Sequence, residues 1–297
     1  MLYMNMNKEM RPCFHIEIVT PKKCVLNGLW FGPKKPKRVI VFVHGLTGSL
    51  FSMKNVVDAL VDKQTAVITF NNRGFGEINT VKRKSGGKSK WILAGAGHEV
   101  FTESLDDIQG AINFVKKAGV KNVYLAGHST GCQKAVFWAN RKGKGVRGII
   151  LLAPVSDWAA EVMLQGKNRV NQTAAVARAL VRSGRKHDLL PKGKVVKRHE
   201  TFDAQRILSL YTPDSIEEIF PYAQPEKSPM TLNSVRTPLL VLWADKDEYS
   251  DRPAKEIAAW FEEHLYTGEV VIVPKVGHGF KGGEKSVVTH IRRFIEA

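Results

Sequence analysis

Ser129 lies in the pentapeptide Gly127-His128-Ser129-Thr130-Gly131, between a short apolar run and a segment suited to a helix. The apolar run, residues 123–126, predicts a strand buried on both faces, and the helix is expected to begin just after Ser129. So abrupt a turn leaves no room for a Cβ atom at either glycine. It would push the Ser129 hydroxyl out of the end of the sheet, beside the helix N-terminus, where it could act as a nucleophile.

The pentapeptide also occurs by chance in ordinary strand-turn-helix connections, so a nucleophile needs partners elsewhere in the chain. His278, flanked by glycines, follows the apolar run at 270–273, and Asp247 follows the run at 238–243. A histidine can take the proton of a serine, and a carboxylate can fix the tautomer of that histidine. Parallel strands place their carboxyl ends at one edge of a sheet, so these three side chains can converge there. Asp245 and Asp157 are alternative acids.

The elements that would position these residues follow a family pattern. An apolar strand precedes His44-Gly45-Leu46-Thr47-Gly48, another precedes Asn71-Asn72-Arg73-Gly74-Phe75-Gly76, and a third precedes the Ser129 pentapeptide. This arrangement resembles the serine esterase and lipase branch of the α/β-hydrolase fold, over residues 39–154 and 238–295. More narrowly, G-H-S-T-G-C-Q-K together with L-L-A-P-V-S-D is similar to the group that contains fungal siderophore-esterase-like proteins.

The resemblance implies an α/β fold with a mostly parallel central sheet, helices on both faces and an inserted helical cap. It implies a catalytic triad of Ser129, Asp247 and His278 in the chain order of that fold, and an oxyanion hole made by the backbone amides of Leu46 and Thr130. The family places its acid three residues after a glycine that ends the strand. Here Ala244 replaces that glycine, and Asp247 keeps the spacing.

Other residues in these motifs are expected to have structural roles. His44 is expected to hydrogen bond to the loop backbone, Arg73 to tie loops together and Cys132 to pack within the helix that follows Ser129. His98 stays an unassigned candidate for substrate contact. No ligand cluster or dinucleotide-binding loop is visible in the sequence, so neither a metal nor an organic cofactor is expected.

Composition describes an ordinary globular protein with an unusual charge. The 297 residues are 43% hydrophobic and 25% charged, with 45 Lys+Arg against 28 Asp+Glu, a net charge of +17. Residues 1–10 show no secretory signal, and three scattered cysteines argue against disulfides or a zinc site, so a cytoplasmic location is expected. The positive charge could attract nucleic acid, an anionic lipid surface or an anionic substrate, or could serve solubility alone.

Two insertions interrupt the predicted core, which comprises residues 1–156 and 237–297. Residues 157–236 lack a strong strand pattern and are read as a helical cap without an independent core. Between residues 161 and 200, ten lysines and arginines stand against three acidic residues. Residues 77–101 are read as a long basic loop that is either solvated or grips an acidic ligand. The basic face of the cap could attract an anionic substrate or, weakly, a membrane surface.

The sequence therefore predicts a hydrolase that cleaves a small carboxylic ester through an acyl-enzyme intermediate. The same residues could cleave a thioester, open a lactone or siderophore ester, or transfer an acyl group. A non-catalytic ligand-binding protein on this fold is the rival from another class. No specific nucleic-acid motif is present, and the sequence predicts no oligomeric state.

Overall fold

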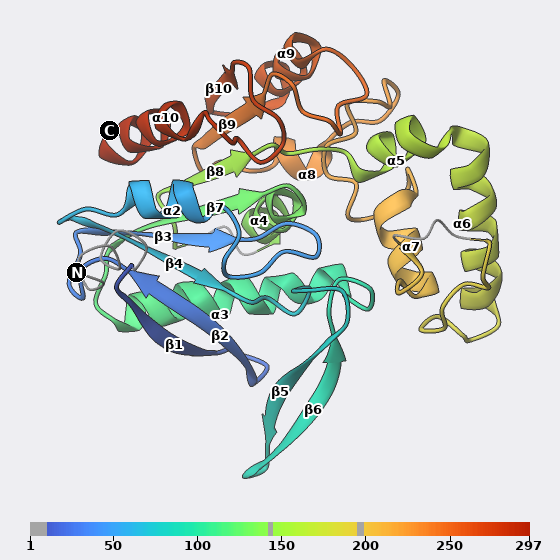
Figure 1. Ribbon diagram of the computed structural model, residues 1–297, viewed down its shortest axis with the longest axis horizontal. Helices are drawn as coiled ribbons and strands as arrows, with labels where there is room; N and C mark the ends of the chain where they lie inside the picture. The colour runs from blue at the N-terminus through green and yellow to red at the C-terminus, as the bar shows by residue number, and fades with distance from the viewer. Residues whose placement is uncertain (1–10, 142–144, 195–198) are drawn as a thin grey trace, which may run out of the picture.

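Runs of aliphatic and aromatic residues form a sheet that is buried on both faces through its centre. Its parallel part has the strand order β10-β9-β8-β7-β3-β4, and the inner strands are buried along nearly their whole length, as uninterrupted apolar runs predict. These strands are β3 (Arg38–Val43), β4 (Thr65–Phe70), β7 (Asn122–His128), β8 (Gly148–Leu152), β9 (Leu239–Ala244) and β10 (Gly268–Val273). Their carboxyl ends share one edge, which faces the helices α5–α7 in Figure 1.

The computed structural model describes residues 11–141, 145–194 and 199–297. The predicted absence of a signal in residues 1–10, and Lys197 and Arg198 of the basic count in the cap, lie outside the described residues. Within the described part, no helix is both long and apolar enough to cross a membrane.

An antiparallel part extends the sheet beyond β4. Strand β2 (Cys24–Phe31) pairs with β4, and β1 (Cys13–Val19) pairs with β2. The expectation of a loop over residues 77–101 was wrong, because β5 (Asn79–Ser85) and β6 (Lys88–Ala94) form a hairpin that projects away from the body (Figure 1). Only its base is buried, at Val81 and Ala94. The sequence concealed the hairpin because its outer residues are polar on both faces and lack an apolar alternation.

Helices cover both faces of the sheet, which confirms the predicted fold class. Helices α2 (Lys54–Leu60) and α10 (Glu284–Glu296) pack on one face. On the other face lie α3 (Ser104–Lys117), preceded by the short helix η1 (Phe101–Glu103), then α4 (Thr130–Arg141) and α9 (Ala254–His264). Serine is a favoured N-cap residue, so the sequence predicts a helix from Ser49 to about residue 62. This prediction was wrong at its start, because Met53 takes a left-handed conformation and α2 begins only at Lys54.

The inserted segment contains α5 (Asp157–Gln165), α6 (Lys167–Arg182), α7 (Ala204–Tyr211) and α8 (Met230–Asn233). Helices α5, α6 and α7 lie beyond the carboxyl edge of the parallel strands (Figure 1). They enclose a second apolar cluster, which includes Val170, Ala177, Ile207 and Leu210 and extends to Ala96 and Leu46 of the core. After α7 the chain returns to the main core, where Phe220 and Leu232 are buried against α4 and α9.

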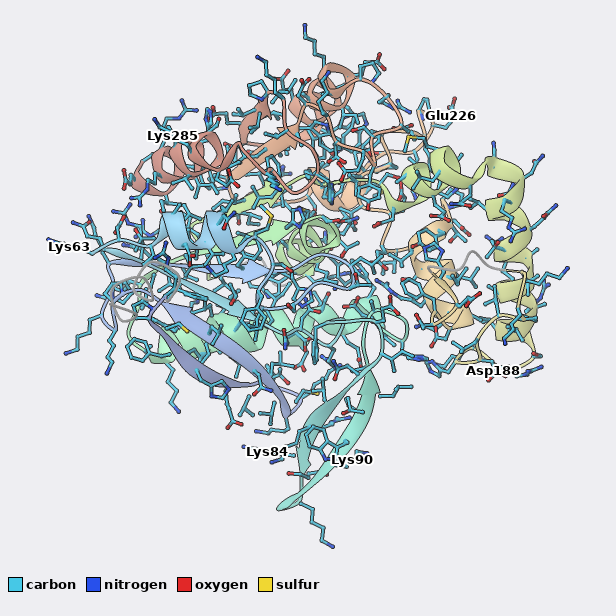
Figure 2. All side chains as sticks on the ribbon, viewed as in Figure 1. Lys63, Lys84, Lys90, Asp188, Glu226 and Lys285 are labelled. Carbon is cyan, nitrogen blue, oxygen red and sulfur yellow. The ribbon has the colours of Figure 1, made fainter. Side chains whose placement is uncertain are left out.

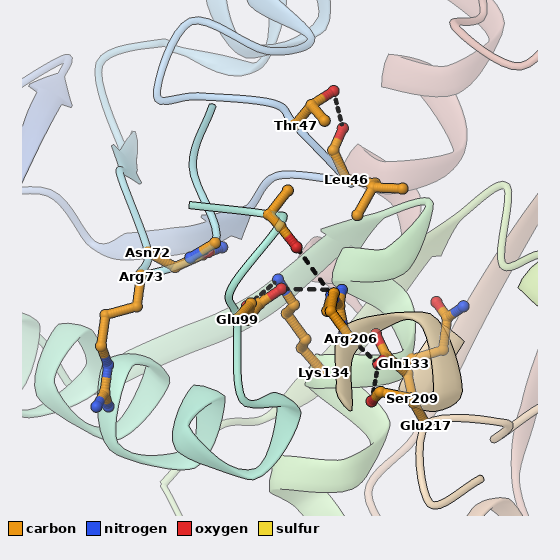
Figure 3. A network of polar contacts seen from close by, with 12 residues as sticks. Leu46, Thr47, Asn72, Arg73, Glu99, Gln133, Lys134, Arg206, Ser209 and Glu217 are labelled. Carbon is orange, nitrogen blue, oxygen red and sulfur yellow. Dashed lines mark hydrogen bonds and ion pairs between the residues drawn. The ribbon is translucent and has the colours of Figure 1, made fainter. Parts of the chain in front are cut away.

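A network of buried charges connects this cap to the core (Figure 3). Arg206 of α7 is completely buried and pairs with Glu99, which precedes η1, and with Glu217; its Nε also donates to the Ala96 carbonyl at 3.0 Å. Glu99 also accepts from Lys134 of α4 at 2.6 Å. Burial alone would raise the pKa of Glu99, but the charges of Lys134 and Arg206 outweigh it and lower that pKa. The four side chains therefore stabilise one another within the buried junction.

We expect Arg206→Ala to lower the free energy of unfolding by about 3 to 5 kcal/mol, because it leaves two buried carboxylates with too few partners. Arg178→Ala in the same cap is the matched control. It removes an exposed contact with Asp214 and should cost less than about 1 kcal/mol. Urea denaturation of the two variants measures both values. Equal losses would contradict a structural role for the buried network.

Candidate active site

The turn between β7 and α4 holds Ser129 in a left-handed backbone conformation, with φ 55°. A Cβ atom at Gly127 would lie 2.3 Å from the Gly131 carbonyl oxygen, and one at Gly131 would lie 2.3 Å from the Val43 carbonyl oxygen. Both carbonyl groups belong to the backbone, so neither can move away by a change of rotamer. The crowding expected from the sequence is therefore present, and the strained residue is the serine.

Two of the predicted site residues contact each other directly. Nδ1 of His278, in the turn after β10, lies 2.8 Å from Oδ2 of Asp247, in the turn after β9. The Asp247 side chain is completely buried, and that of His278 is 11% exposed. A carboxylate only accepts, so Nδ1 carries the proton and donates it, which leaves Nε2 as an acceptor.

The alternative acids lie elsewhere. Asp245 is partly exposed and its carboxylate is near the Lys246 ammonium group and the Lys275 amide, not the histidine. Asp157, at the start of α5, accepts from Gln133 Nε2 at 2.7 Å. Burial raises the pKa of Asp157 well above its usual range, and the nearby Glu217 and Glu218 raise it further. Of the three acids, Asp247 alone is hydrogen bonded to His278.

Further contacts hold the His278 turn in place, and the sequence reading missed them. Glu248 accepts from the His278 amide at 2.9 Å, and the Tyr249 ring packs edge-on against the imidazole at 4.8 Å. His128, the residue before the serine, donates from Nε2 to the His278 carbonyl at 3.0 Å. Burial lowers the pKa of His128 to about 4, and the adjacent His278 lowers it too, so His128 is neutral at pH 7. In the sequence, the only sign of these roles is that Glu248 and Tyr249 follow Asp247 and that His128 precedes Ser129.

Two backbone segments lie next to the serine, the first turn of α4 and the loop after β3. Thr130 is the first residue of α4, so its amide has no acceptor within the helix. Gly45, which precedes Leu46, lies very close to the serine. A Cβ atom at residue 45 would be 2.8 Å from the Cβ atom of Ser129, so the loop after β3 can approach Ser129 this closely only because residue 45 is glycine. His44 contacts the Gly45 carbonyl through Nδ1 at 2.9 Å, the loop contact expected from the sequence.

Ser129 and His278 line a cavity of about 450 Å³ between the sheet edge and the cap. The core contributes Gly45, Leu46, Thr47, His128 and Tyr249, and the cap contributes Asp157, Glu161, Leu164, His199, Phe202 and Tyr211. The lining thus combines apolar and polar side chains. Among the described residues, no group of three or more His, Cys, Asp or Glu side chains is arranged to hold a metal ion.

Three residues singled out in the sequence lie away from this cavity. Arg73 is buried and pairs with Glu103, Asp106 and Asp107 of the η1–α3 segment, so it ties the loop after β4 to α3 as expected. Cys132 is buried in α4 and donates to the Gly127 carbonyl. His98 contacts Asp203, the N-cap of α7, at 3.2 Å and belongs to the junction of core and cap.

We expect Gly127→Ala to destabilise the fold by about 1 to 3 kcal/mol, because the new methyl group overlaps the Gly131 carbonyl. Gly279→Ala is the matched control, since its Cβ would enter open space at an exposed position. It should leave stability unchanged within about 0.5 kcal/mol or raise it slightly. Thermal unfolding distinguishes the two. A Gly127→Ala variant as stable as Gly279→Ala would show that the turn is not crowded.

Solved structures of similar shape are α/β-hydrolases with low sequence identity. Siderophore hydrolase EstB from Aspergillus fumigatus is 18% identical, with a TM-score of 0.68 over 97% of this chain and 98% of that one. Alpha/beta hydrolase GrgF from Penicillium sp. sh18 is 15% identical, with a TM-score of 0.63 over 96% and 98%. Est1E from Butyrivibrio proteoclasticus, solved with ferulic acid, is 16% identical, with a TM-score of 0.59 over 94% and 97%.

At these identities the likeness establishes a shared α/β-hydrolase fold and does not extend to substrates. No curated protein matches the chain. Residues 30–263, well over half of the sequence, match a family whose description is "Protein of unknown function (DUF1749)". The chain therefore belongs to the DUF1749 family and has the α/β-hydrolase fold.

Proposed function

We propose that this protein is a serine hydrolase that cleaves a carboxylic ester through an acyl-enzyme intermediate. The observation that supports this most strongly is the His278–Asp247 hydrogen bond at the wall of the cavity that Ser129 enters from a strained turn. A plain strand-turn-helix connection would need neither the strain nor a buried carboxylate behind the histidine. A non-catalytic binding protein on this fold leaves both features unexplained.

In the proposed reaction, His278 Nε2 takes the proton of the Ser129 hydroxyl as Oγ attacks the ester carbonyl. Asp247 stabilises the imidazolium that forms, and the amides of Leu46 and Thr130 donate to the developing oxyanion. His278 then protonates the departing alcohol, which leaves an acyl-serine. The same histidine activates a water molecule that releases the acid and restores the serine.

The cavity favours an uncharged, polar ester of modest size. Its volume of about 450 Å³ is in the lower half of the range for small-ligand pockets, roughly 300 to 1,000 Å³. The described residues that line the cavity include the carboxyl groups of Asp157 and Glu161 and no lysine or arginine, which does not favour the anionic substrate suggested by the charge of the whole chain. The raised pKa of Asp157 favours its protonated form, which can donate a hydrogen bond to a polar substituent.

The same three side chains could open a lactone or cleave a siderophore ester. The similarity of the fold to that of the siderophore hydrolase EstB is the reason to test that substrate class. A thioester, or an alcohol acting as acyl acceptor, would use the same residues. A panel of p-nitrophenyl esters, run with thioester and lactone substrates, distinguishes these classes. We expect acetate and butyrate esters to react faster than long-chain esters, in line with the limited cavity.

We expect Asp247→Asn to lower kcat for p-nitrophenyl acetate by at least about a hundredfold and as much as ten-thousandfold, because the amide no longer stabilises the histidine in its reactive tautomer. Asp245→Asn is the matched control, since that carboxylate does not touch His278. It should change kcat less than about threefold, as a partly exposed group outside the site should. Steady-state kinetics at several pH values measures both.

Asp157→Asn tests whether Asp157 supplies the acid instead of Asp247. We expect kcat for the acetate to stay within about tenfold, since Asp157 lines the cavity without contacting His278, and KM for polar esters to change little, since the amide keeps a neutral hydrogen-bond donor there. A near-wild-type Asp247→Asn variant together with an inactive Asp157→Asn variant would overturn the assignment of the acid. Inactivity of all three variants with normal folding would point to a different mechanism.

A further inference from the structure

The β5–β6 hairpin is fixed at its base and free at its outer end. Two residues of β5, Lys82 and Arg83, pair with β2, and Val81 and Ala94 are buried against the core. The Arg83 Nε donates to the Lys22 carbonyl, and the Lys84 amide donates to the Lys23 carbonyl at 3.0 Å. Everything from Lys82 to Trp91 is exposed. The hairpin is therefore a supported arm that holds its outer side chains away from the body.

One face of this arm concentrates positive charge without local compensation. Arg83 lies directly opposite Lys90 in the antiparallel register, and like charges at such positions destabilise a strand pair. Residues 79–94 contain no acidic residue. Lys22 and Lys23 of the β1–β2 turn join Arg83 and Lys90 around a surface hollow, and Lys84, whose side chain belongs to the other face of the strand pair, also borders it. None of these five side chains has an ion-pair partner among the described residues. A bound anion would remove the repulsion that the fold leaves in place.

The opposite face of the arm is apolar and flanked by lysines. Trp91 is 69% exposed and Leu93 is 59% exposed, and they lie two residues apart on the same face of β6. Lys82 lies directly opposite Trp91, and Lys84 opposite Ser89. Tryptophan with neighbouring lysines is typical of the membrane interface, where the indole ring enters the headgroup region and the ammonium groups reach the phosphates.

We propose that the β5–β6 hairpin docks this protein on an anionic phospholipid surface. The arm enters the headgroup layer with its outer end first, so lipid surrounds both of its faces. The basic hollow takes phosphate headgroups on one face, and Trp91 and Leu93 enter the interface on the other. Two features favour lipid over nucleic acid. Trp91 could stack on one base, but its exposed neighbour Leu93 is aliphatic and offers no second stacking platform, and the arm projects outward instead of forming a groove that follows a strand. Figure 2 shows Lys84 and Lys90 on this arm, far from Lys63 and Lys285 on the opposite part of the molecule.

Vesicle co-sedimentation at physiological ionic strength tests the proposal. Wild type should bind vesicles of equal parts phosphatidylcholine and phosphatidylglycerol, and bind phosphatidylcholine alone far more weakly. Each basic residue at an anionic surface contributes roughly fivefold to partitioning, so Arg83→Gln with Lys90→Gln should weaken binding about 25-fold. Lys63→Gln with Lys285→Gln removes the same charge elsewhere and should weaken it less than about threefold, because the sites are screened from the contact.

Trp91 gives a second, independent readout. Brominated phosphatidylcholine mixed into the anionic vesicles should quench part of the tryptophan emission of wild type, and Trp91→Phe should lose that quenching. Thermal unfolding should show that the Arg83/Lys90 variant is as stable as wild type or more so, since the repulsion is gone. The proposal is independent of the proposed catalytic activity, which these variants should leave unchanged.

Three results would overturn the proposal. Equal binding to neutral and anionic vesicles is one, and equal losses from the hairpin variant and the Lys63/Lys285 control are another. The third is tighter binding of wild type to a single-stranded oligonucleotide than to vesicles, weakened by the hairpin variant, which would assign the arm to nucleic acid.

Discussion

Steric crowding where β7 turns into α4 is the constraint on which the rest of the candidate site depends. The Gly131 and Val43 carbonyls occupy the space that side chains at residues 127 and 131 would need, and the backbone relieves the crowding by placing Ser129 in the left-handed region. Such a conformation typically costs about 1 to 3 kcal/mol, so it persists only where the surrounding packing enforces it. The buried parallel strands on either side of β7 supply that packing.

The parallel sheet then brings distant segments to the serine. Residues 45, 129, 247 and 278 each follow a different strand, and all lie at the same edge. Two hydrogen bonds join the turn after β9 to the turn after β10. Asp247 accepts one from the His278 imidazole, and Glu248 accepts the other from the His278 backbone amide. The cap is fixed to the same edge by Arg206, whose partner Glu99 also binds Lys134 in the helix that begins at the serine. The position of the cap is therefore coupled to helix α4 through two buried ion pairs.

The sequence predicted those parts of the fold whose burial is uniform. Strands β3, β4, β8 and β9 are apolar along most of their length because both faces are covered, so an uninterrupted apolar run marks each of them in the sequence. The hairpin β5–β6 was missed because solvent surrounds its outer half, so no alternation marks it. The start of α2 was misplaced because the left-handed backbone at Met53, which no side-chain pattern reveals, delays the helix. In the site, the positions of His278 and Asp247 just after neighbouring strands were enough to predict that they meet. The contacts of Glu248, Tyr249 and His128 depend on the conformation of loops, which the spacing of residues in the sequence does not reveal.

We propose that the strained serine is chemically reactive because His278 and Asp247 activate it. Labelling with a fluorophosphonate probe, followed by intact-mass and peptide analysis, measures this reactivity. One adduct should form, on Ser129; it should be absent in Ser129→Ala and form much more slowly in His278→Ala, while both variants stay folded. Failure of the folded wild type to react, or labelling of Ser129→Ala at the wild-type rate, would contradict it.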